Sequence, residues 1–566
     1  MNSLEKAQQW LKSPFDEETI EEVRSLIDTD PGTLNDSFYT DLAFGTGGMR
    51  GVLGAGTNRI NKYTLGRATQ GLANFLKEQY SDIRVVIAYD CRHGSDTLSK
   101  IVAEILSANN IKVSLFSSLR TTPELSFAVR YLNAQAGIVL TASHNPPEYN
   151  GYKVYSSDGG QIVPPEDKQI IEAINAISFD QINFDANTGL IELIDEEVDK
   201  AFFAESVKAG SFNAAGKEDF RLVFTSIHGT SITAIPPVLE LAGFKNVDIV
   251  KEQAAPNGDF PTVKSPNPEE TEALAMAMDL AETKQADMVI GTDPDSDRLG
   301  IAVRNPSGTL ELLNGNQTMI VMTEYLLRLA KKKGLKGNEF IASTIVSTPM
   351  LKELAKAYEV DFKISLTGFK WIGKMIKDFP QQSFIGGGEE SYGFMVGDFV
   401  RDKDAVTASL LASEIGSQLK SESSSFYNLL IDCYLSYGFY KERLISITKK
   451  GQEGASEIRK MMNDFEARPP KTIVGETLKY IENYNTSTRI NLETGEKEMI
   501  DLPTSNVIIY ETTKGTRVAA RPSGTEPKIK FYISTKTQLE SAEVFEKTNK
   551  DIEAKIDQII SELQLN

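Results

Sequence analysis

Short apolar runs alternate with amphipathic stretches along most of this chain. In the N-terminal part, residues 84–88, 112–116 and 136–140 have the length and composition of buried strands, and residues 97–109 have the period of an amphipathic helix. Strands and helices in alternation pack as a largely parallel sheet covered by helices. The pattern therefore predicts an α/β domain.

The same pattern restarts twice further along the chain. A strand at 221–225, a helix at 235–242 and a strand at 288–291 form one repeat, and a helix at 317–332 with a strand at 340–345 begins another. From Ser421 onward the character changes to a helix at 456–465, short strands and a final helix at 539–563. We predict three similar α/β domains and a smaller α+β domain, over residues 1–205, 206–315, 316–435 and 436–566.

Composition excludes several classes of protein. The 566 residues are 40 % hydrophobic and 25 % charged, as in a chain that is folded throughout. The formal net charge of -19 makes nucleic acid a poor partner. No run of about 18 apolar residues predicts a membrane span. Two cysteines and a polar N-terminus without a signal or transit pattern favour the cytoplasm.

The first candidate site is Thr141-Ala142-Ser143-His144-Asn145-Pro146-Pro147, directly after the strand predicted at 136–140. Ligands of open α/β sheets gather where strands end. The prolines exclude a continuing helix, so we expect Ser143 on a tight exposed loop. A serine that already carries a phosphate can donate it, with a neighbouring cation stabilising the charge. An ordinary polar turn explains this segment alone equally well.

A second candidate follows the strand predicted at 288–291. Asp293, Asp295 and Asp297 stand at alternate positions and form a set of hard oxygen ligands that suits Mg²⁺ or Ca²⁺. A calcium-binding EF-hand loop is excluded, because its sixth and twelfth positions would be Arg298 and Arg304. A solvated acidic turn is the alternative, but three close carboxylates repel one another without a cation.

Two further segments carry groups suited to a phosphorylated sugar. Residues 386–393 are glycine-rich and place Glu389 and Ser391 on one side of an extended segment, where they are able to accept hydrogen bonds from vicinal hydroxyls. Residues 521–527 bring together a guanidinium, two hydroxyls and a loop amide, which match a phosphate dianion. A simple turn is the alternative for each. Residues 45–51 are also glycine-rich and contain Arg50.

In this order, the four motifs resemble the α-D-phosphohexomutase superfamily, the phosphoglucomutases and phosphomannomutases, over residues 40–532. The resemblance implies four domains around a central cleft, three of them alike with mixed sheets. It makes Ser143 the phosphoserine, and makes Asp293, Asp295 and Asp297 the Mg²⁺ ligands together with its phosphate. The cations near the transferring phosphate, with a proton donor or acceptor among them, would be Arg50, His144, Lys153, Arg298 and Lys403.

The resemblance also implies how the sugar is held. Glu389 and Ser391 would contact its hydroxyls, and Thr367 and Gly368 would belong to the loop that helps to select it. The phosphate that is not being transferred would be bound by Arg521, Ser523, Gly524, Thr525 and Lys530.

We therefore expect an isomerase that interconverts glucose 1-phosphate and glucose 6-phosphate, with glucose 1,6-bisphosphate as intermediate and activator. Residues 389–392, Glu-Glu-Ser-Tyr, follow the glucose-type pattern. Residues 368–371 and 150–153 resemble the branch that also contains phosphopentomutases, so mannose and pentose phosphates are alternative substrates. A non-catalytic phosphosugar-binding relative and a metal-dependent phosphatase are alternatives from other classes. No oligomeric state is predicted.

Overall fold

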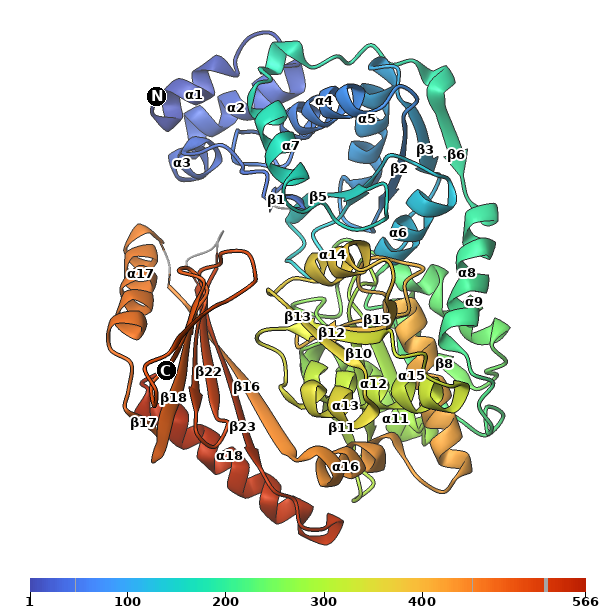
Figure 1. The fold of residues 1–566 in the computed structure, drawn as a ribbon. Helices are drawn as coiled ribbons and strands as arrows, with labels where there is room; N and C mark the ends of the chain where they lie inside the picture. Colours follow the sequence, from blue (N-terminus) through green and yellow to red (C-terminus); the bar gives the residue numbers. More distant parts are fainter. Residues whose placement is uncertain (46, 450, 524–527, 566) are drawn as a thin grey trace. The chain divides into compact units, whose positions relative to one another are not determined.

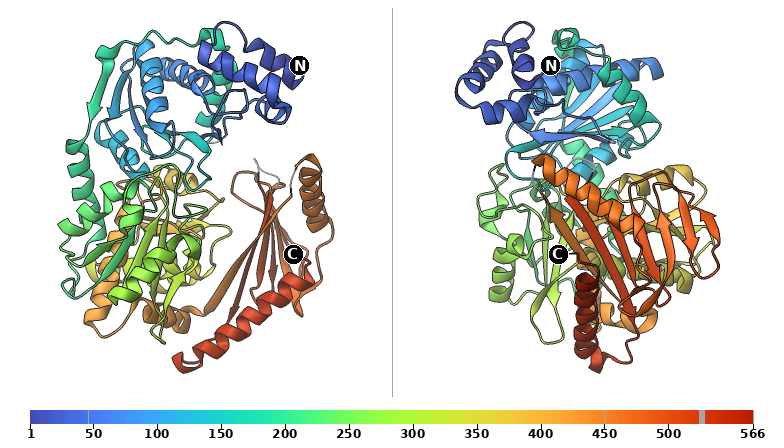
Figure 2. Two further views of the ribbon diagram at one scale, coloured as in Figure 1. Left: turned by 180° about the vertical axis from the view of Figure 1, so that it is seen from behind. Right: turned by 90° about the vertical axis from the view of Figure 1, so that its left-hand side faces the viewer.

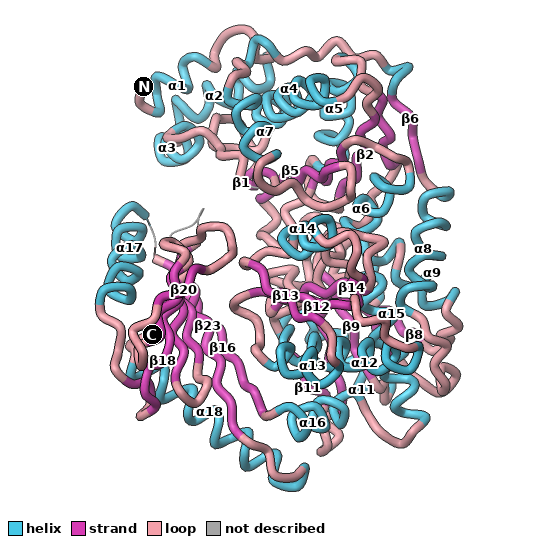
Figure 3. Tube along the Cα trace, viewed as in Figure 1, coloured by secondary structure: helices cyan, strands magenta, loops and turns pink. Residues whose placement is uncertain are grey.

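The computed structural model describes residues 1–45, 47–449, 451–523 and 528–565. By their contacts the residues form two compact units, one of residues 1–315 with 369–425 and the other of residues 316–368 with 426–566. Helices and strands alternate as far as residue 421, and strands dominate the C-terminal part (Figure 3). Among the described residues, no helix is long and apolar enough to cross a membrane.

The first unit begins with three helices and a six-stranded mixed sheet (Figure 1). The sheet order is β1-β5-β4-β2-β3-β6, with the four strands from β4 to β6 in this order parallel and both β5 pairings antiparallel. The elements are α1 (Ser3–Gln9), α2 (Glu17–Thr29), α3 (Pro31–Phe38), β1 (Gly48–Val52), α4 (Lys62–Gln79), β2 (Arg84–Tyr89), α5 (Ser95–Ala108), β3 (Lys112–Phe116), α6 (Thr122–Tyr131), β4 (Ala136–Leu140), β5 (Tyr149–Ser156), α7 (Glu166–Asn175) and β6 (Ile191–Ile194).

Alternation along β4 explains how this sheet is buried on both faces. Ala136, Ile138 and Leu140 join the core that α4, α5 and α7 form on one face. Gly137 points to the other face, where a Cβ would meet the side chain of Val129 on α6 at 2.5 Å. With both faces covered, the carboxyl ends of the parallel strands are left as the open edge at which loops can form a site.

A second mixed sheet in the same unit follows helix α8 (Glu196–Gly210). Its strand order is β11-β10-β9-β7-β8, in which β7 is parallel to β8 and β9, and β10 is antiparallel to β9 and β11. The elements are β7 (Leu222–Thr225), α9 (Ile235–Leu241), β8 (Val247–Ile249), α10 (Lys251–Ala254), α11 (Thr271–Lys284), β9 (Met288–Thr292), β10 (Leu299–Arg304) and β11 (Leu310–Leu313).

The third α/β region contributes elements to both units. The first unit contains the antiparallel pair β14 (Ser383–Glu389) and β15 (Gly393–Val396), with α14 (Lys370–Asp378) and α15 (Ala405–Ser421). The second contains the parallel pair β12 (Glu339–Thr344) and β13 (Asp361–Ser365), with α12 (Gly315–Lys333), α13 (Met350–Tyr358) and α16 (Phe426–Tyr437).

The C-terminal region of the second unit is an antiparallel sheet in the order β16-β23-β22-β21-β18-β19-β20, with β17 beside β18. Helices α17 and α18 pack against one face of it (Figure 2). The elements are β16 (Phe439–Thr448), α17 (Gly451–Ala467), β17 (Thr472–Ile473), β18 (Glu476–Asn483), β19 (Thr488–Asn491), β20 (Lys497–Met499), β21 (Ile508–Thr512), β22 (Arg517–Pro522), β23 (Lys528–Thr537) and α18 (Phe545–Glu562).

The predicted fold class is confirmed, with three mixed-sheet α/β domains and a C-terminal domain built on an antiparallel sheet. The final helix begins at Phe545 and not near residue 539, because a short 3-10 turn, Ala542–Val544, precedes it. The domain boundaries near residues 205, 315 and 435 stay a prediction.

Candidate active site

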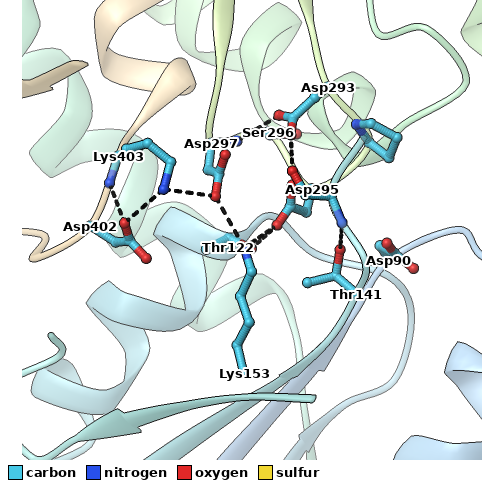
Figure 4. Close-up of polar contacts among 12 residues, drawn as sticks. Asp90, Thr122, Thr141, Lys153, Asp293, Asp295, Ser296, Asp297, Asp402 and Lys403 are labelled. Atoms are coloured by element: carbon cyan, nitrogen blue, oxygen red, sulfur yellow. Dashed lines mark hydrogen bonds and ion pairs between the residues drawn. The ribbon is translucent and has the colours of Figure 1, made fainter. Parts of the chain in front are cut away.

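The three aspartates predicted as metal ligands lie together in the loop between β9 and β10 (Figure 4). Asp293 and Asp295 are fully buried and Asp297 is 2 % exposed. Each offers a carboxylate oxygen, and these oxygens lie within 4.8 Å of one another. The loop is closed by Asp293 Oδ1, which accepts hydrogen bonds from the backbone N–H groups of Asp297 (3.1 Å) and Arg298 (3.0 Å).

The donor set fits a divalent cation. Oδ1 of Asp295 and Oδ1 of Asp297 are buried, and neither has a hydrogen-bond partner among the described residues. A buried carboxylate oxygen without a partner is costly, and a bound cation would satisfy both. The arrangement is therefore consistent with a metal site.

Two lysines, one on strand β5 and one in the segment after β15, partly neutralise this triad (Figure 4). Lys153 Nζ lies 2.6 Å from Asp295 Oδ2 and 3.0 Å from Asp297 Oδ2, and Lys403 Nζ lies 3.1 Å from Asp297 Oδ2. Burial opposes ionisation of Asp297, but the two lysines outweigh it and hold the pKa of this carboxyl well below its usual range. The pKa of Asp293 is raised by burial and by its two carboxylate neighbours.

Ser143 contacts the triad directly. Its Oγ donates a hydrogen bond of 2.6 Å to Asp293 Oδ2 and lies 3.2 Å from Nδ1 of His144. The residue has φ 52°, in the left-handed region that a serine adopts only at an energetic cost. The prediction of an exposed position is wrong, because Ser143 is 3 % exposed and its Oγ faces the second domain's loop.

The sheet of the first domain explains why Lys153 reaches the same place as Ser143. Lys153 pairs with Val139 across β4 and β5, close to the carboxyl end of β4, and Ser143 lies three residues beyond that end. Thr122, in the first turn of α6, donates through Oγ1 to Asp295 Oδ2 at 2.9 Å. Strand ends of the first domain thus meet the metal loop of the second within one compact unit.

Arg298 and Arg50 are held by specific partners near the triad. Arg298 forms an ion pair through Nη1 with Glu269, and its Nε lies 4.0 Å from Asp297 Oδ1. Arg50 Nη1 donates to Asn145 Oδ1 at 2.8 Å, on the loop that carries Ser143. Both cations therefore lie close to the groups that the sequence predicts to transfer phosphate.

Glu389 lies beside these cations, but its loop differs from the prediction. β14 ends at Glu389, and Tyr392 has φ 65°, so the chain turns before β15 and Ser391 lies in the turn and not on an extended segment. The turn is anchored to the metal loop, because Leu299 N donates to Tyr392 O at 2.9 Å. Glu389 is 4 % exposed, and its charge acts on both Arg298 and Lys403.

The remaining predicted residues belong to the second unit. Arg521 and Lys530 are direct partners across β22 and β23, and Ser523 N donates to Lys528 O at 2.7 Å where this hairpin narrows. Because Ala520 and Ile529 face the helices, Arg521 and Lys530 lie on the opposite face of the sheet. Thr367 and Gly368 follow β13 in the same unit. Gly524 and Thr525 lie outside the described residues.

Some residues in this site escaped sequence reasoning. Tyr155 donates to Asp402 Oδ2 at 2.8 Å, and Asp402 Oδ1 lies 3.2 Å from Lys403 Nζ. Arg92 Nη2 donates a hydrogen bond to Ser143 O and so contacts the Ser143 loop. A signal for Arg92 is present, since Asp90-Cys91-Arg92-His93 places charged residues directly after a buried strand. Glu269 and Asp402 carry no such signal.

Phosphoryl transfer is the chemistry that this arrangement can serve. A hydroxyl nucleophile, a carboxylate metal set and flanking cations place and neutralise a phosphoryl group, which is what its transfer requires. Together with three mixed α/β domains, these features define a phosphohexomutase, an isomerase that moves phosphate within one sugar.

Comparison with known proteins agrees with this class. Residues 41–181, 201–308 and 314–434 match the family profiles of phosphoglucomutase/phosphomannomutase α/β/α domains I, II and III. A phosphoglucomutase from Staphylococcus epidermidis is 40 % identical over 501 residues, 88 % of this chain and 91 % of the relative. One from Staphylococcus haemolyticus is 38 % identical over 536 residues, 94 % and 96 % of the two chains. The chain belongs to the phosphoglucomutase/phosphomannomutase family.

Solved structures share the fold at low sequence identity. Parafusin, a phosphoglucomutase from Paramecium, aligns with a TM-score of 0.67 at 18 % identity over 93 % of this chain and 96 % of its own. A phosphoglucomutase/phosphomannomutase family protein from Burkholderia thailandensis aligns with a TM-score of 0.64 at 16 % identity over 92 % and 97 %. The family fold is thus retained where little sequence identity remains.

Proposed function

We propose that this chain interconverts glucose 1-phosphate and glucose 6-phosphate, and that Ser143 carries the phosphate between turnovers. The observation that carries the proposal is the 2.6 Å contact between Ser143 Oγ and Asp293 Oδ2. It places a hydroxyl oxygen against the buried triad, where a phosphate on that oxygen would be bound. The name phosphoglucomutase, given to relatives about 40 % identical, supports glucose as the sugar.

Two buried lysines supply positive charge near Ser143. Lys153 and Lys403 lie within 3.1 Å of carboxylates of the triad. Burial lowers the pKa of Lys153, but Asp295 and Asp297 outweigh it, so this pKa is raised. The pKa of Lys403 is raised in the same way by Asp297 and Asp402. Both lysines stay cationic at neutral pH. Fixed cations of this kind stabilise negative charge on a transferring phosphoryl group.

The proposed reaction has two transfers. In the first, a free sugar hydroxyl attacks phosphorus of phosphoserine 143 and gives its proton to a base. The P–Oγ bond breaks and Ser143 Oγ takes up a proton, which leaves glucose 1,6-bisphosphate and a free serine hydroxyl. The bisphosphate then reorients within the site, so that its other phosphate faces Ser143. In the second, Ser143 Oγ attacks the other phosphate, its proton passes to the departing sugar oxygen, and the phosphoenzyme is restored. No phosphate is consumed.

Roles in binding the sugar are also proposed for the residues predicted from the sequence. Glu389 and Ser391 would accept hydrogen bonds from sugar hydroxyls, and Arg521, Ser523 and Lys530, with Gly524 and Thr525, would bind the phosphate at rest. His144, with Nδ1 3.2 Å from Ser143 Oγ, is within reach of the proton in transfer. Thr367 and Gly368 would help to select the sugar.

Mg²⁺ is the cation we propose for the triad, because carboxylate oxygens are its preferred protein ligands and it leaves positions for phosphate oxygens. Asp293, Asp295 and Asp297 would hold it, and when bound it would neutralise charge on the phosphate of Ser143. A cytoplasmic location also stays a proposal, supported by two cysteines that are both free thiols.

Rate comparison with three sugars tests the proposal. The purified chain is assayed with glucose 1-phosphate, mannose 1-phosphate and ribose 1-phosphate, with Mg²⁺ and catalytic glucose 1,6-bisphosphate. Isomerisation of glucose 1-phosphate at the highest kcat/KM is expected. A strong preference for mannose or ribose would overturn the substrate, and release of inorganic phosphate in place of isomerisation would favour a phosphatase.

Intact mass tests the role of Ser143. The active enzyme is expected to carry one phosphate, and Ser143→Ala to carry none and to lose nearly all turnover. Ser157→Ala, an exposed serine of the same domain, is the matched control and should retain both phosphate and activity. Full activity of Ser143→Ala would refute the phosphoserine, and would equally favour a non-catalytic role for this loop.

A further inference from the structure

We propose that Arg92 is a positioning residue for phosphoryl transfer, whose guanidinium fixes the loop that carries Ser143. The inference rests on the proposed role of Ser143 and assigns a function to a residue outside the predicted site. Arg92 lies in the loop after β2, beside the carboxyl end of β4, where the Ser143 loop begins.

Four carbonyl oxygens of that loop accept hydrogen bonds from one side chain. Arg92 Nη2 donates to Ser143 O at 2.5 Å and also to Asn145 O, and Nη1 donates to Pro146 O at 2.8 Å and Tyr149 O at 3.1 Å. These four residues span the whole connection from Ser143 to the first residue of β5. The guanidinium therefore sets the path of the loop as a unit.

The carbonyls use four of the five N–H donors of the guanidinium. The fifth donor, on Nε, lies 3.4 Å from Asp90 Oδ2 in an ion pair, and neither of these two atoms has a hydrogen-bond partner among the described residues. The side chains of Arg92 and Asp90 are both 0 % exposed. Buried charges are stable only when they are paired and hydrogen-bonded. The Arg92–Asp90 ion pair is therefore part of the core beneath the loop.

The clamp acts where the backbone is under strain. Ser143 has φ 52°, a conformation that persists only when surrounding contacts overdetermine it. Arg92 holds the carbonyl of this residue, and Thr141 Oγ1 accepts a hydrogen bond from its N–H at 2.8 Å. With both backbone groups fixed, the Oγ is directed to Asp293 Oδ2.

Arg92 also ties the loop to the second domain. Its guanidinium lies over the ring of Phe260 at 5.1 Å from the centroid. A Cβ at Gly258 would lie 3.1 Å from Arg92 Cα and 2.8 Å from His93 N, so these two segments of the backbone approach closely. His93 Nε2 and Asp259 Oδ1, 2.6 Å apart, close the contact. These contacts fix the position of the Ser143 loop relative to the domain that supplies the aspartates.

The closing experiment compares Arg92→Lys with Arg59→Lys. Lysine keeps the charge but not the planar fork, so it cannot reach four carbonyls. Arg59 is a matched control, because it is a buried arginine of the same domain that donates hydrogen bonds to Asp36 and Asn58. Within the described part of the chain it forms no hydrogen bond or ion pair with the Ser143 loop. Each variant is assayed for kcat, KM for glucose 1-phosphate, thermal midpoint, and single-turnover phosphate transfer from the phosphoenzyme.

For Arg92→Lys we expect kcat and the single-turnover rate to fall about 100-fold, the loss typical of a misplaced reacting group, with KM changed less than about threefold. Arg59→Lys should change kcat less than about twofold. An Arg92→Lys enzyme with a wild-type thermal midpoint and kcat within about threefold of wild type would overturn the inference.

A second variant covers the case in which Arg92→Lys does not fold. Phe260→Leu removes the ring beneath the guanidinium and leaves every loop hydrogen bond in place, so kcat should fall about tenfold with little change in KM. An unchanged kcat for this variant would overturn the coupling to the second domain. Wild-type enzyme without phosphate on Ser143 would instead refute the proposed function, so the two failures are distinguishable.

Discussion

The hydroxyl of Tyr155 donates a hydrogen bond of 2.8 Å to Oδ2 of Asp402. Both side chains are buried, and Asp402 Oδ1 in turn lies 3.2 Å from the Nζ of Lys403, whose other partner is Asp297. The chain of contacts begins at Tyr155 on β5 of the first domain, passes through Asp402 and Lys403, which follow β15, and ends at the aspartate triad. Lys403 therefore depends for its position on a tyrosine of another domain.

Tyr155→Phe should lower kcat about tenfold, because Asp402 loses the donor that orients it and Lys403 gains freedom. Tyr152→Phe is the matched control, since Tyr152 is equally buried on the same strand but faces the other side, where Thr69 donates to its hydroxyl at 3.2 Å. Steady-state assays of both variants decide the point. Equal activity for the two would show that Tyr155 has only a packing role.

Removal of the metal should abolish turnover and lower stability. After chelation with EDTA we expect kcat to fall at least about 100-fold, because a metal ion supplies several kcal/mol of charge stabilisation. Added Mg²⁺ should restore activity and raise the thermal midpoint. Asp295→Asn should lose this rise in midpoint, whereas Asp279→Asn, an exposed aspartate on α11, should keep it. A wild-type thermal midpoint that does not change when Mg²⁺ is added would contradict the metal site.

Stability should fall with rising pH through the titration of Asp404. This side chain caps α15 through Oδ1, while the buried Oδ2 has no hydrogen-bond partner among the described residues, and burial raises its pKa to about 6. The folded state holds the proton that an unfolded chain releases near the ordinary value of 3.8. The stabilisation, about 3 kcal/mol for two pKa units, is complete below pH 4 and is lost as pH rises through 6.

Asp404→Asn tests this assignment, because the amide keeps the capping oxygen and cannot ionise. Thermal midpoints of wild type and variant are compared between pH 4.5 and 7.5. The advantage of the variant should grow as pH rises. A difference that stays constant across this range would assign the titration to another group.

Gly151→Ala should displace the Ser143 loop. Gly151 lies on β5 between β1 and β4, and a Cβ there would lie 2.4 Å from the carbonyl oxygen of Thr141 and 2.9 Å from that of Met49. Forcing these backbones apart should cost about 1–3 kcal/mol of stability and lower kcat. Gly189→Ala, an exposed glycine whose Cβ would meet only Asn187 Oδ1 at 3.4 Å, should be neutral in both measurements.

Particular residues show why much of the site could be predicted. The predicted fold class and family are confirmed. Strand ends are short-range features that periodicity locates: the strands predicted to end at residues 140 and 291 end at 140 and 292. Asp293, Asp295 and Asp297 are clustered by their spacing within one loop, so local sequence was enough to propose a metal set. The roles of the individual residues stay predictions.

Other features arise only from contacts between distant segments. No sequence pattern marks Asp402 or Glu269 as part of the site. Asp402 acquires its role from its contacts with Tyr155 and Lys403, and Glu269 acquires its role from its ion pair with Arg298. The sequence predicts an exposed loop for Ser143, since prolines and polar residues favour the surface. Burial at 3 % exposure follows from the second domain packing against that loop.

By itself the sequence determined the α/β repeats, the family and the local groups that bear chemistry, since these depend on residues a few positions apart. Only the tertiary structure decided that Lys153 and Lys403 share Asp297, that Arg92 holds four carbonyls of the Ser143 loop, and that Ser143 is buried against Asp293. The physical reason is that hydrogen bonds and charge pairs act over a few ångströms, and folding alone brings these distant residues within that range.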